Sequence, residues 1–188
     1  MLITAHHGTT ATIAARIKGG EEFTPSTNIG DWLGTGIYFW QDAPKRAAYW
    51  ARRAARRAKD KPAVLETQID LTNCLDLLDL FAFNTMKVEC AEFERRTSGY
   101  EQDPLVIEDG ATVYPPDGTR LVDRNKKDKA LFDFATASIE AKTGKPVPVV
   151  RSAFLWGEAL HKTSFVFDWS NVHICVRDHS AIQSYEIL

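Results

Sequence analysis

Residues 32–40, Trp32-Leu33-Gly34-Thr35-Gly36-Ile37-Tyr38-Phe39-Trp40, are the most informative stretch of this chain. Gly34 and Gly36 lack a Cβ atom, so the backbone can turn sharply here or come close to a ligand. The β-branched and aromatic side chains that follow predict a short strand over Ile37 to Trp40. A helix with two aromatic residues near its start is predicted from Asp42 to Lys59, with Asp42 as its cap. These features indicate either a slot for a flat ring or a buried hairpin with ordinary core aromatics.

The N-terminus predicts a strand followed by a short helix. The strand covers Leu2 to Ala5, and His7-Gly8-Thr9 comes at its end. Apolar residues then recur at helical spacing until Gly19-Gly20, which ends the helix. We therefore expect His7 at a strand-to-helix junction, where ligand-binding groups often gather.

These residues resemble the ADP-ribosyltransferase superfamily, of the poly-ADP-ribose-polymerase-like (His-Tyr-Glu) type. That family has His-Gly-Ser/Thr on its first core strand, as in His7-Gly8-Thr9. It has Gly-x-Gly-Ile-Tyr-Phe on a later strand, where Tyr38 matches, and a second aromatic about eleven positions on, where Tyr49 matches. The resemblance is strong over about residues 2 to 51, weak over the last twenty, and absent from the middle of the chain.

The resemblance implies a site for NAD as substrate. The main chain of Gly8 would hold the nicotinamide carboxamide, and Tyr38 and Tyr49 would sandwich the ring. His7 would bond a ribose hydroxyl on the adenosine side, with help from Thr9.

Arg46 departs from the family pattern, which often has a small hydroxyl residue there that bonds the nicotinamide amide. It would instead reach a phosphate or point outward.

A second departure concerns the third catalytic position, which is usually a glutamate at the start of a late strand. Laid on that pattern, His173-Ile174-Cys175-Val176-Arg177-Asp178 puts His173 in place of the acid. A neutral imidazole can bond a hydroxyl and take a proton near pH 7, but it offers no negative charge to an oxocarbenium-like state. Glu158, Gln183 and Glu186 are the alternatives, each of which is otherwise a surface polar residue. Family members without the acid usually transfer one ADP-ribose or are inactive, so the resemblance disfavours chain elongation.

The remaining pattern mixes helices and strands without a βαβ rhythm, which predicts an α+β fold with mostly antiparallel pairing. The resemblance adds that the sheet is split and flanked by helices. The turn-rich segment from Ser98 to Arg124 is the best candidate for a lid or a recognition insertion, with a small hairpin over 105–114 as one interpretation. The other expected elements are strands over Ala63–Leu71, Val147–Trp156, Asn171–Asp178 and Ile182–Leu188, and helices over Phe83–Arg96 and Asn125–Lys142.

Length and composition are those of one ordinary globular domain. The chain has 188 residues, 44% hydrophobic and 26% charged, with a net charge of −2 that gives no global attraction to nucleic acid or membrane. Its three cysteines lack zinc-like spacing and read as reduced thiols. We see no signal peptide and no apolar run of transmembrane length, so the expected compartment is the cytoplasm. A basic run reads as a solvated helix face or as a surface for phosphates or an antitoxin: Arg52, Arg53, Arg56, Arg57, Lys59 and Lys61.

The sequence therefore predicts an NAD-dependent mono-ADP-ribosyltransferase, hypothesised to be a bacterial toxin or phage-defence effector that modifies a protein or a nucleic acid. One alternative is an inactive member of the same fold that binds NAD, ADP-ribose or a partner protein. A second is an RNA 2′-phosphotransferase, which would need several Arg and His residues around the site.

Overall fold

The computed structural model describes residues 1–26, 28, 31–97, 121–155, 157–164 and 166–188, which form a seven-stranded sheet with flanking helices. The sheet order is β4-β5-β6-β2-β1-β3-β7, and every neighbouring pair is antiparallel except β4 and β5. The strands are β1 (Leu2–Thr10), β2 (Ile37–Gln41), β3 (Pro62–Asp70), β4 (Leu75–Asp76), β5 (Val149–Phe154), β6 (Asn171–Val176) and β7 (Ile182–Ile187). The helices are α1 (Ala11–Lys18), α2 (Pro44–Ala58), α3 (Leu80–Thr97), α4 (Leu121–Thr143) and the 3₁₀ turn η1 (His179–Ala181). The expected α+β class with mostly antiparallel pairing is confirmed.

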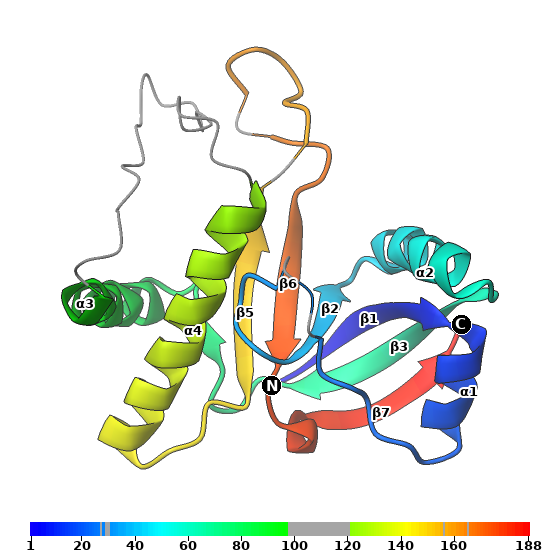
Figure 1. Ribbon diagram of the computed structural model, residues 1–188, viewed down its shortest axis with the longest axis horizontal. Helices are drawn as coiled ribbons and strands as arrows, with labels where there is room; N and C mark the ends of the chain where they lie inside the picture. The colour runs from blue at the N-terminus through cyan, green and yellow to red at the C-terminus, as the bar shows by residue number, and fades with distance from the viewer. Residues whose placement is uncertain (27, 29–30, 98–120, 156, 165) are drawn as a thin grey trace.

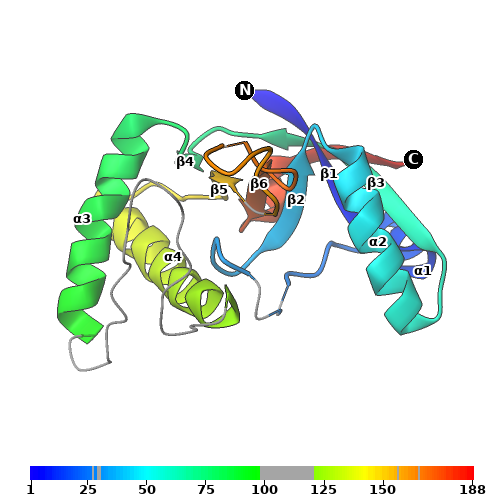
Figure 2. The same ribbon diagram turned by 90° about the horizontal axis from the view of Figure 1, so that it is seen from above.

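The sheet has two halves whose strands run in different directions. β5 and β6 run steeply in Figure 1, whereas β1, β3 and β7 lie across the view, with α2 on one side of them and α1 on the other. From above, α3 and α4 stand at one end of the molecule, α1 and α2 stand at the other, and β6 and β2 lie between them (Figure 2). β2 is therefore the strand at which the two halves meet.

Side chains of β2 alternate between two cores, as a half-buried strand requires. Ile37 and Phe39 belong to a core with Phe23, Leu65 and other apolar residues from the α1 side of the sheet. Tyr38 packs on the opposite face against a second core that includes residues of α3 and α4. None of the helices in the described ranges is both long and apolar enough to cross a membrane.

The first strand is longer than predicted. β1 pairs with β3 without interruption from Leu2↔Asp70 to Thr10↔Pro62, so His7 lies inside the strand and not at its end. The strand-to-helix junction falls at Thr10, whose side chain accepts a hydrogen bond from the Ile13 N–H and caps α1. The prediction that His7 sits at this junction was wrong, because pairing with β3 holds the chain extended for longer than its own apolar pattern indicates.

The start of α2 also differs from the prediction. Asp42 does not cap the helix; it has a φ of 48° and its N–H bonds the carbonyl of Thr4 in β1. Ala43 takes the cap position without a side-chain hydrogen bond, and Pro44 is the first helical residue. A proline suits that position because its missing N–H is not needed there and its φ is already helical.

Two other helices begin a few residues before their predicted starts. α3 begins at Leu80, before the predicted Phe83, because the Asp79 side chain accepts hydrogen bonds from the N–H groups of Phe81 and Ala82. α4 begins at Leu121, so the last four residues of the predicted insertion at Ser98 to Arg124 are helical. The rest of that insertion, with its lid and hairpin, lies outside the described residues.

Candidate functional site

Strands β1 and β2 separate next to His7. Their pairing covers only Ala5↔Gln41 and His6↔Trp40. Beyond these pairs, Nδ1 of His7 lies 2.9 Å from the carbonyl oxygen of Tyr38. A carbonyl can only accept, so Nδ1 carries the proton and Nε2 of the neutral ring is an acceptor. Burial lowers the pKa of His7, which favours this neutral form.

Gly8 directs its main-chain polar groups into this separation. The N–H of Ala11 bonds the Lys61 carbonyl, and the N–H of Leu71 bonds the Met1 carbonyl. In an antiparallel pair every second residue exchanges hydrogen bonds with the neighbouring strand, and the residues between them point their N–H and C=O the other way. By that alternation the odd-numbered residues of β1 bond to β3, and the N–H and C=O of Gly8 face β2. One donor and one acceptor on the same residue match the two polar groups of a carboxamide.

A glycine is required at position 8 because α2 lies directly on it. A Cβ atom there would stand 2.1 Å from the carbonyl oxygen of Ala47 and 2.9 Å from the nitrogen of Ala51. The buried face of α2 consists of Ala47, Ala51 and Ala55, so small side chains on both elements allow the close approach. Tyr49 and Arg46, on the same helix, are thereby carried to the vicinity of β1.

Tyr38 is held by the glycine turn that precedes it. Its hydroxyl donates to the Gly34 carbonyl at 2.7 Å and accepts from the Leu33 N–H at 2.9 Å. Burial raises the pKa of Tyr38, so the phenol stays protonated. The hydroxyl therefore fixes the turn and is not available to a ligand.

Tyr49 lies on the exposed side of α2. Its ring contacts Trp50 and Trp169, with centroids 6.1 and 4.8 Å away. Within the described part of the chain Tyr38 and Tyr49 make no ring contact with each other. The two-tyrosine sandwich stays a prediction.

Arg46 and Thr9 lie on opposite sides of the sheet. The Arg46 guanidinium lies 4.2 Å from the Trp169 ring centroid and donates to the carbonyl of Asp168, so it points toward the 157–170 connection. Thr9 lines a pocket of about 180 Å³ on the α1 side, together with His7, Arg16, Phe23 and Thr24. The pocket adjoins the ring of His7, beside the separation of β1 and β2.

His173 belongs to a row of residues that crosses the sheet. The pairing registers join Ser152 to His173, His173 to Trp40, Trp40 to His6, His6 to Glu66 and Glu66 to Glu186. Registered neighbours point to the same face of a sheet. His173 therefore shares its face with Trp40 and His6, two residues that the sequence reasoning missed.

The contacts of His173 favour its neutral form, with the proton on Nε2. The indole N–H of Trp32 lies 3.2 Å from Nδ1, and an indole can only donate, so the proton of the imidazole sits on Nε2. Burial lowers the pKa of His173 to about 4. Trp32, Trp40 and Phe154 surround the ring, so burial disfavours the proton that position 173 was expected to take up near pH 7.

The other candidates for the third position lie elsewhere. Glu158 is exposed in the connection between β5 and β6, where its N–H bonds the side chain of Asp168. Gln183 and Glu186 are on β7, which β2, β1 and β3 separate from β6. His173 is the candidate nearest β2, because it pairs with Trp40 directly.

Two contacts on this face were absent from the sequence prediction. Trp40 stacks on Trp50 of α2 at a centroid distance of 6.0 Å and an interplanar angle of 19°. His6 bonds Glu66 at 3.1 Å, and its Nδ1 is buried with no partner in the described ranges. The period of two along each strand was a signal for Trp40, which shares a face with Tyr38. The pairing of His6 with Glu66 depends on register, which no local pattern reveals.

The turn before β2 depends on Asp133 of α4. This carboxylate accepts from the N–H and hydroxyl of Thr35 at 2.6 and 3.0 Å and contacts Lys129 at 2.7 Å. Arg177 also reaches it at 3.4 Å.

We expect Asp133→Ala to lower the free energy of unfolding by about 2 kcal/mol, because hydrogen bonds to a charged group are lost together. Urea unfolding measures this, and Asp133→Asn, which keeps one carbonyl oxygen, should lose less. Equal stability of the alanine variant and the parent protein would contradict this role.

Compared with protein-family models, curated proteins and solved structures, the chain matches none.

Proposed function

We propose that the protein is an NAD-dependent mono-ADP-ribosyltransferase. The observation that carries the proposal is the separation of β1 and β2, where Gly8 presents a main-chain donor and acceptor beside His7. The carboxamide of nicotinamide binds at Gly8. Nε2 of His7 accepts a hydrogen bond from a ribose hydroxyl, and the pocket lined by Thr9 and Phe23 takes the adenosine side of NAD.

The reaction is a displacement at C1′ of the nicotinamide ribose. The bond from C1′ to the pyridinium nitrogen breaks, nicotinamide leaves as a neutral molecule, and an acceptor oxygen or nitrogen bonds C1′ and loses its proton to water. The protein contributes by holding the leaving group and the ribose in place. The aromatic rings of Tyr38 and Trp40, on β2, are the groups available to stack on nicotinamide.

The neutral His173 supports transfer of a single ADP-ribose. Its Nε2–H can donate to a hydroxyl, and without a negative charge it does not act as the carboxylate of chain-elongating enzymes does. We further propose that it is a bacterial toxin or phage-defence effector, which rests on the resemblance of residues 2 to 51.

One alternative has an observation in its favour. An inactive NAD- or ADP-ribose-binding module of the same fold would also lack a carboxylate at position 173, and His173 does not act as a base near pH 7. Binding without turnover is what separates that function from the transferase.

The deciding experiment follows nicotinamide released from NAD, with and without cell lysate. His7→Ala is expected to reduce release at least tenfold, because the ribose hydroxyl loses its acceptor and the strand separation loses the ring that spans it. His161→Ala, a change at an exposed histidine in the β5–β6 connection, is the matched control and should leave release unchanged.

NAD binding is measured in parallel by titration calorimetry, and the fold of each variant is checked by its thermal unfolding. Binding with no release in any mixture would overturn the transferase and favour the binding module. If the protein neither binds NAD nor releases nicotinamide, NAD is not its substrate or ligand.

A further inference from the structure

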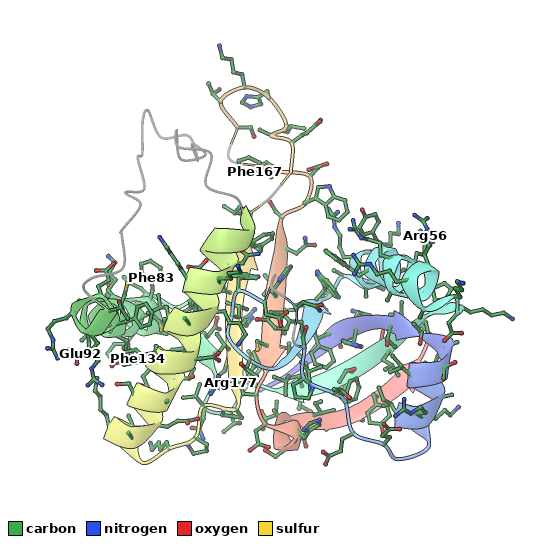
Figure 3. The ribbon with its side chains drawn as sticks, in the orientation of Figure 1. Arg56, Phe83, Glu92, Phe134, Phe167 and Arg177 are labelled. Atoms are coloured by element: carbon green, nitrogen blue, oxygen red, sulfur yellow. The ribbon has the colours of Figure 1, made fainter. Side chains whose placement is uncertain are left out.

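The outward face of α2 is densely basic. The helix carries Lys45, Arg46, Arg52, Arg53, Arg56 and Arg57 and contains no aspartate or glutamate. In the described part of the chain none of these six side chains forms an ion pair with a carboxylate, although ion pairs occur elsewhere in the protein. Figure 3 shows Arg56 on the side of α2 that points away from the sheet. The net charge of the whole chain is −2, so the positive charge of α2 is a local feature.

Aromatic rings are exposed beside these cations. Tyr49 is 37% exposed and Trp50 is 41% exposed, although large aromatic side chains are usually more buried. Arg53 lies over both rings, 5.2 Å from the Trp50 centroid and 5.9 Å from the Tyr49 centroid. Trp169 extends the surface, packed edge to face on Tyr49 with Arg46 over its ring.

We propose that α2 and Trp169 form a docking surface for a single-stranded nucleic acid, which is the acceptor of the transferred ADP-ribose. A basic face that follows the backbone, combined with aromatic rings on which bases stack, is how proteins hold single strands. A duplex would offer phosphates but keep its base faces covered, so the exposed rings favour a single strand. An acidic protein partner would use the cations and leave the stacking rings unexplained.

The surface is connected to the proposed site. Trp50 stacks on Trp40, and Trp40 is registered between His173 and His6 on the sheet. Ala47 and Ala51, on the inner face of the same helix, lie against Gly8. A nucleic-acid strand whose bases stack on Tyr49 and Trp50 would therefore run past the edge of the NAD site. The role of the strand as acceptor rests on the proposed transferase function, whereas its binding does not.

The first experiment measures binding of a fluorescent 12-nucleotide RNA of mixed sequence by anisotropy, without NAD and over a range of salt concentrations. Three phosphate contacts predict a slope of log affinity against log salt of about −2. A triple variant, Arg52→Gln, Arg56→Gln and Arg57→Gln, should bind more weakly and make the slope clearly less steep, because three of the six cations on α2 are removed. Trp50→Ala should weaken binding at least about fivefold with the slope little changed, because stacking is not ionic.

The matched control removes three cations from α3: Lys87→Gln, Arg95→Gln and Arg96→Gln. These residues are exposed on a helix that lies at the other end of the molecule from α2 (Figure 2), so RNA binding should stay close to that of the parent protein. An equal loss in both triple variants, equal affinity for the corresponding duplex, or full affinity in Trp50→Ala would overturn the proposal.

A second readout separates this proposal from the transferase function. The protein is incubated with the same RNA and NAD labelled in its adenine ring, and the label on the RNA is followed on a denaturing gel. Label on the RNA that the α2 triple variant loses supports the assignment. RNA binding with no nicotinamide release leaves the docking surface in place and refutes the transferase. Lysate-dependent release without RNA binding or labelling refutes the docking surface together with its acceptor role and leaves the transferase in place.

Discussion

Gly8→Ala is expected to lower the free energy of unfolding by about 3 kcal/mol or more, the largest loss of stability that we predict for a single methyl group. The added Cβ would stand 2.1 Å from the Ala47 carbonyl oxygen. That oxygen belongs to the backbone, and the position of a Cβ is fixed by its own backbone, so neither atom can rotate away. α2 must then rise from β1 or the strand must bend. In a chain of this length the midpoint of thermal unfolding should fall by roughly 10 °C.

Gly19→Ala is the control for this prediction. Gly19 has a φ of −77°, and a Cβ atom there would come no closer than 3.3 Å to the Arg16 carbonyl, so the substitution should be tolerated. Differential scanning calorimetry of the two variants and the parent protein measures the difference. If Gly8→Ala and Gly19→Ala unfold at the same temperature, α2 does not rest on β1 at Gly8. The aromatic residues of α2 are then not held near that strand.

This packing explains how much of the site the sequence could predict. β2 and α2 were predicted within two residues at each end, because their signals are local: β-branched and aromatic residues for the strand, and Pro44 with spaced alanines for the helix. His7, Gly8, Tyr38 and Tyr49 were selected on a motif, and the structure places the first three along the strands that separate. Their binding of NAD remains a prediction.

What could not be predicted depends on pairing between distant strands. The separation of β1 from β2 is spanned by the hydrogen bond from His7 to the Tyr38 carbonyl, 31 residues away. The row that brings Trp40, His6 and His173 together is a consequence of register, and a shift of one residue would turn each side chain to the other face. β4 has only two residues, so it carries no pattern of its own and forms by pairing with β5.

Stability of the protein is expected to fall as the pH is lowered from 6.5 to 4, because of His173. Its pKa is about 4 in the folded protein and near 6.5 in the unfolded chain. Between these values the unfolded chain binds a proton that the folded protein does not, so acid favours unfolding. A shift of this size corresponds to about 3 kcal/mol, which is fully present above pH 6.5 and lost on the way to pH 4.

Urea unfolding at half-unit steps between pH 7.5 and 4 measures this loss, and His173→Gln isolates it. A glutamine can still accept from the Trp32 indole through Oε1 but has no proton to take up, so the variant should lose less stability over the range than the parent protein. The loss that remains includes the contribution of His7, whose pKa is also lowered by burial. Asp60 and Glu92, whose pKa values lie near 2, lose their contributions only below about pH 4, which keeps their acid effect outside the measured window. His161→Gln, at an exposed position, should behave as the parent protein does. If the parent protein and His173→Gln lose stability in parallel, the imidazole is not held neutral by Trp32 and its aromatic neighbours, and a proton-accepting role at position 173 becomes tenable.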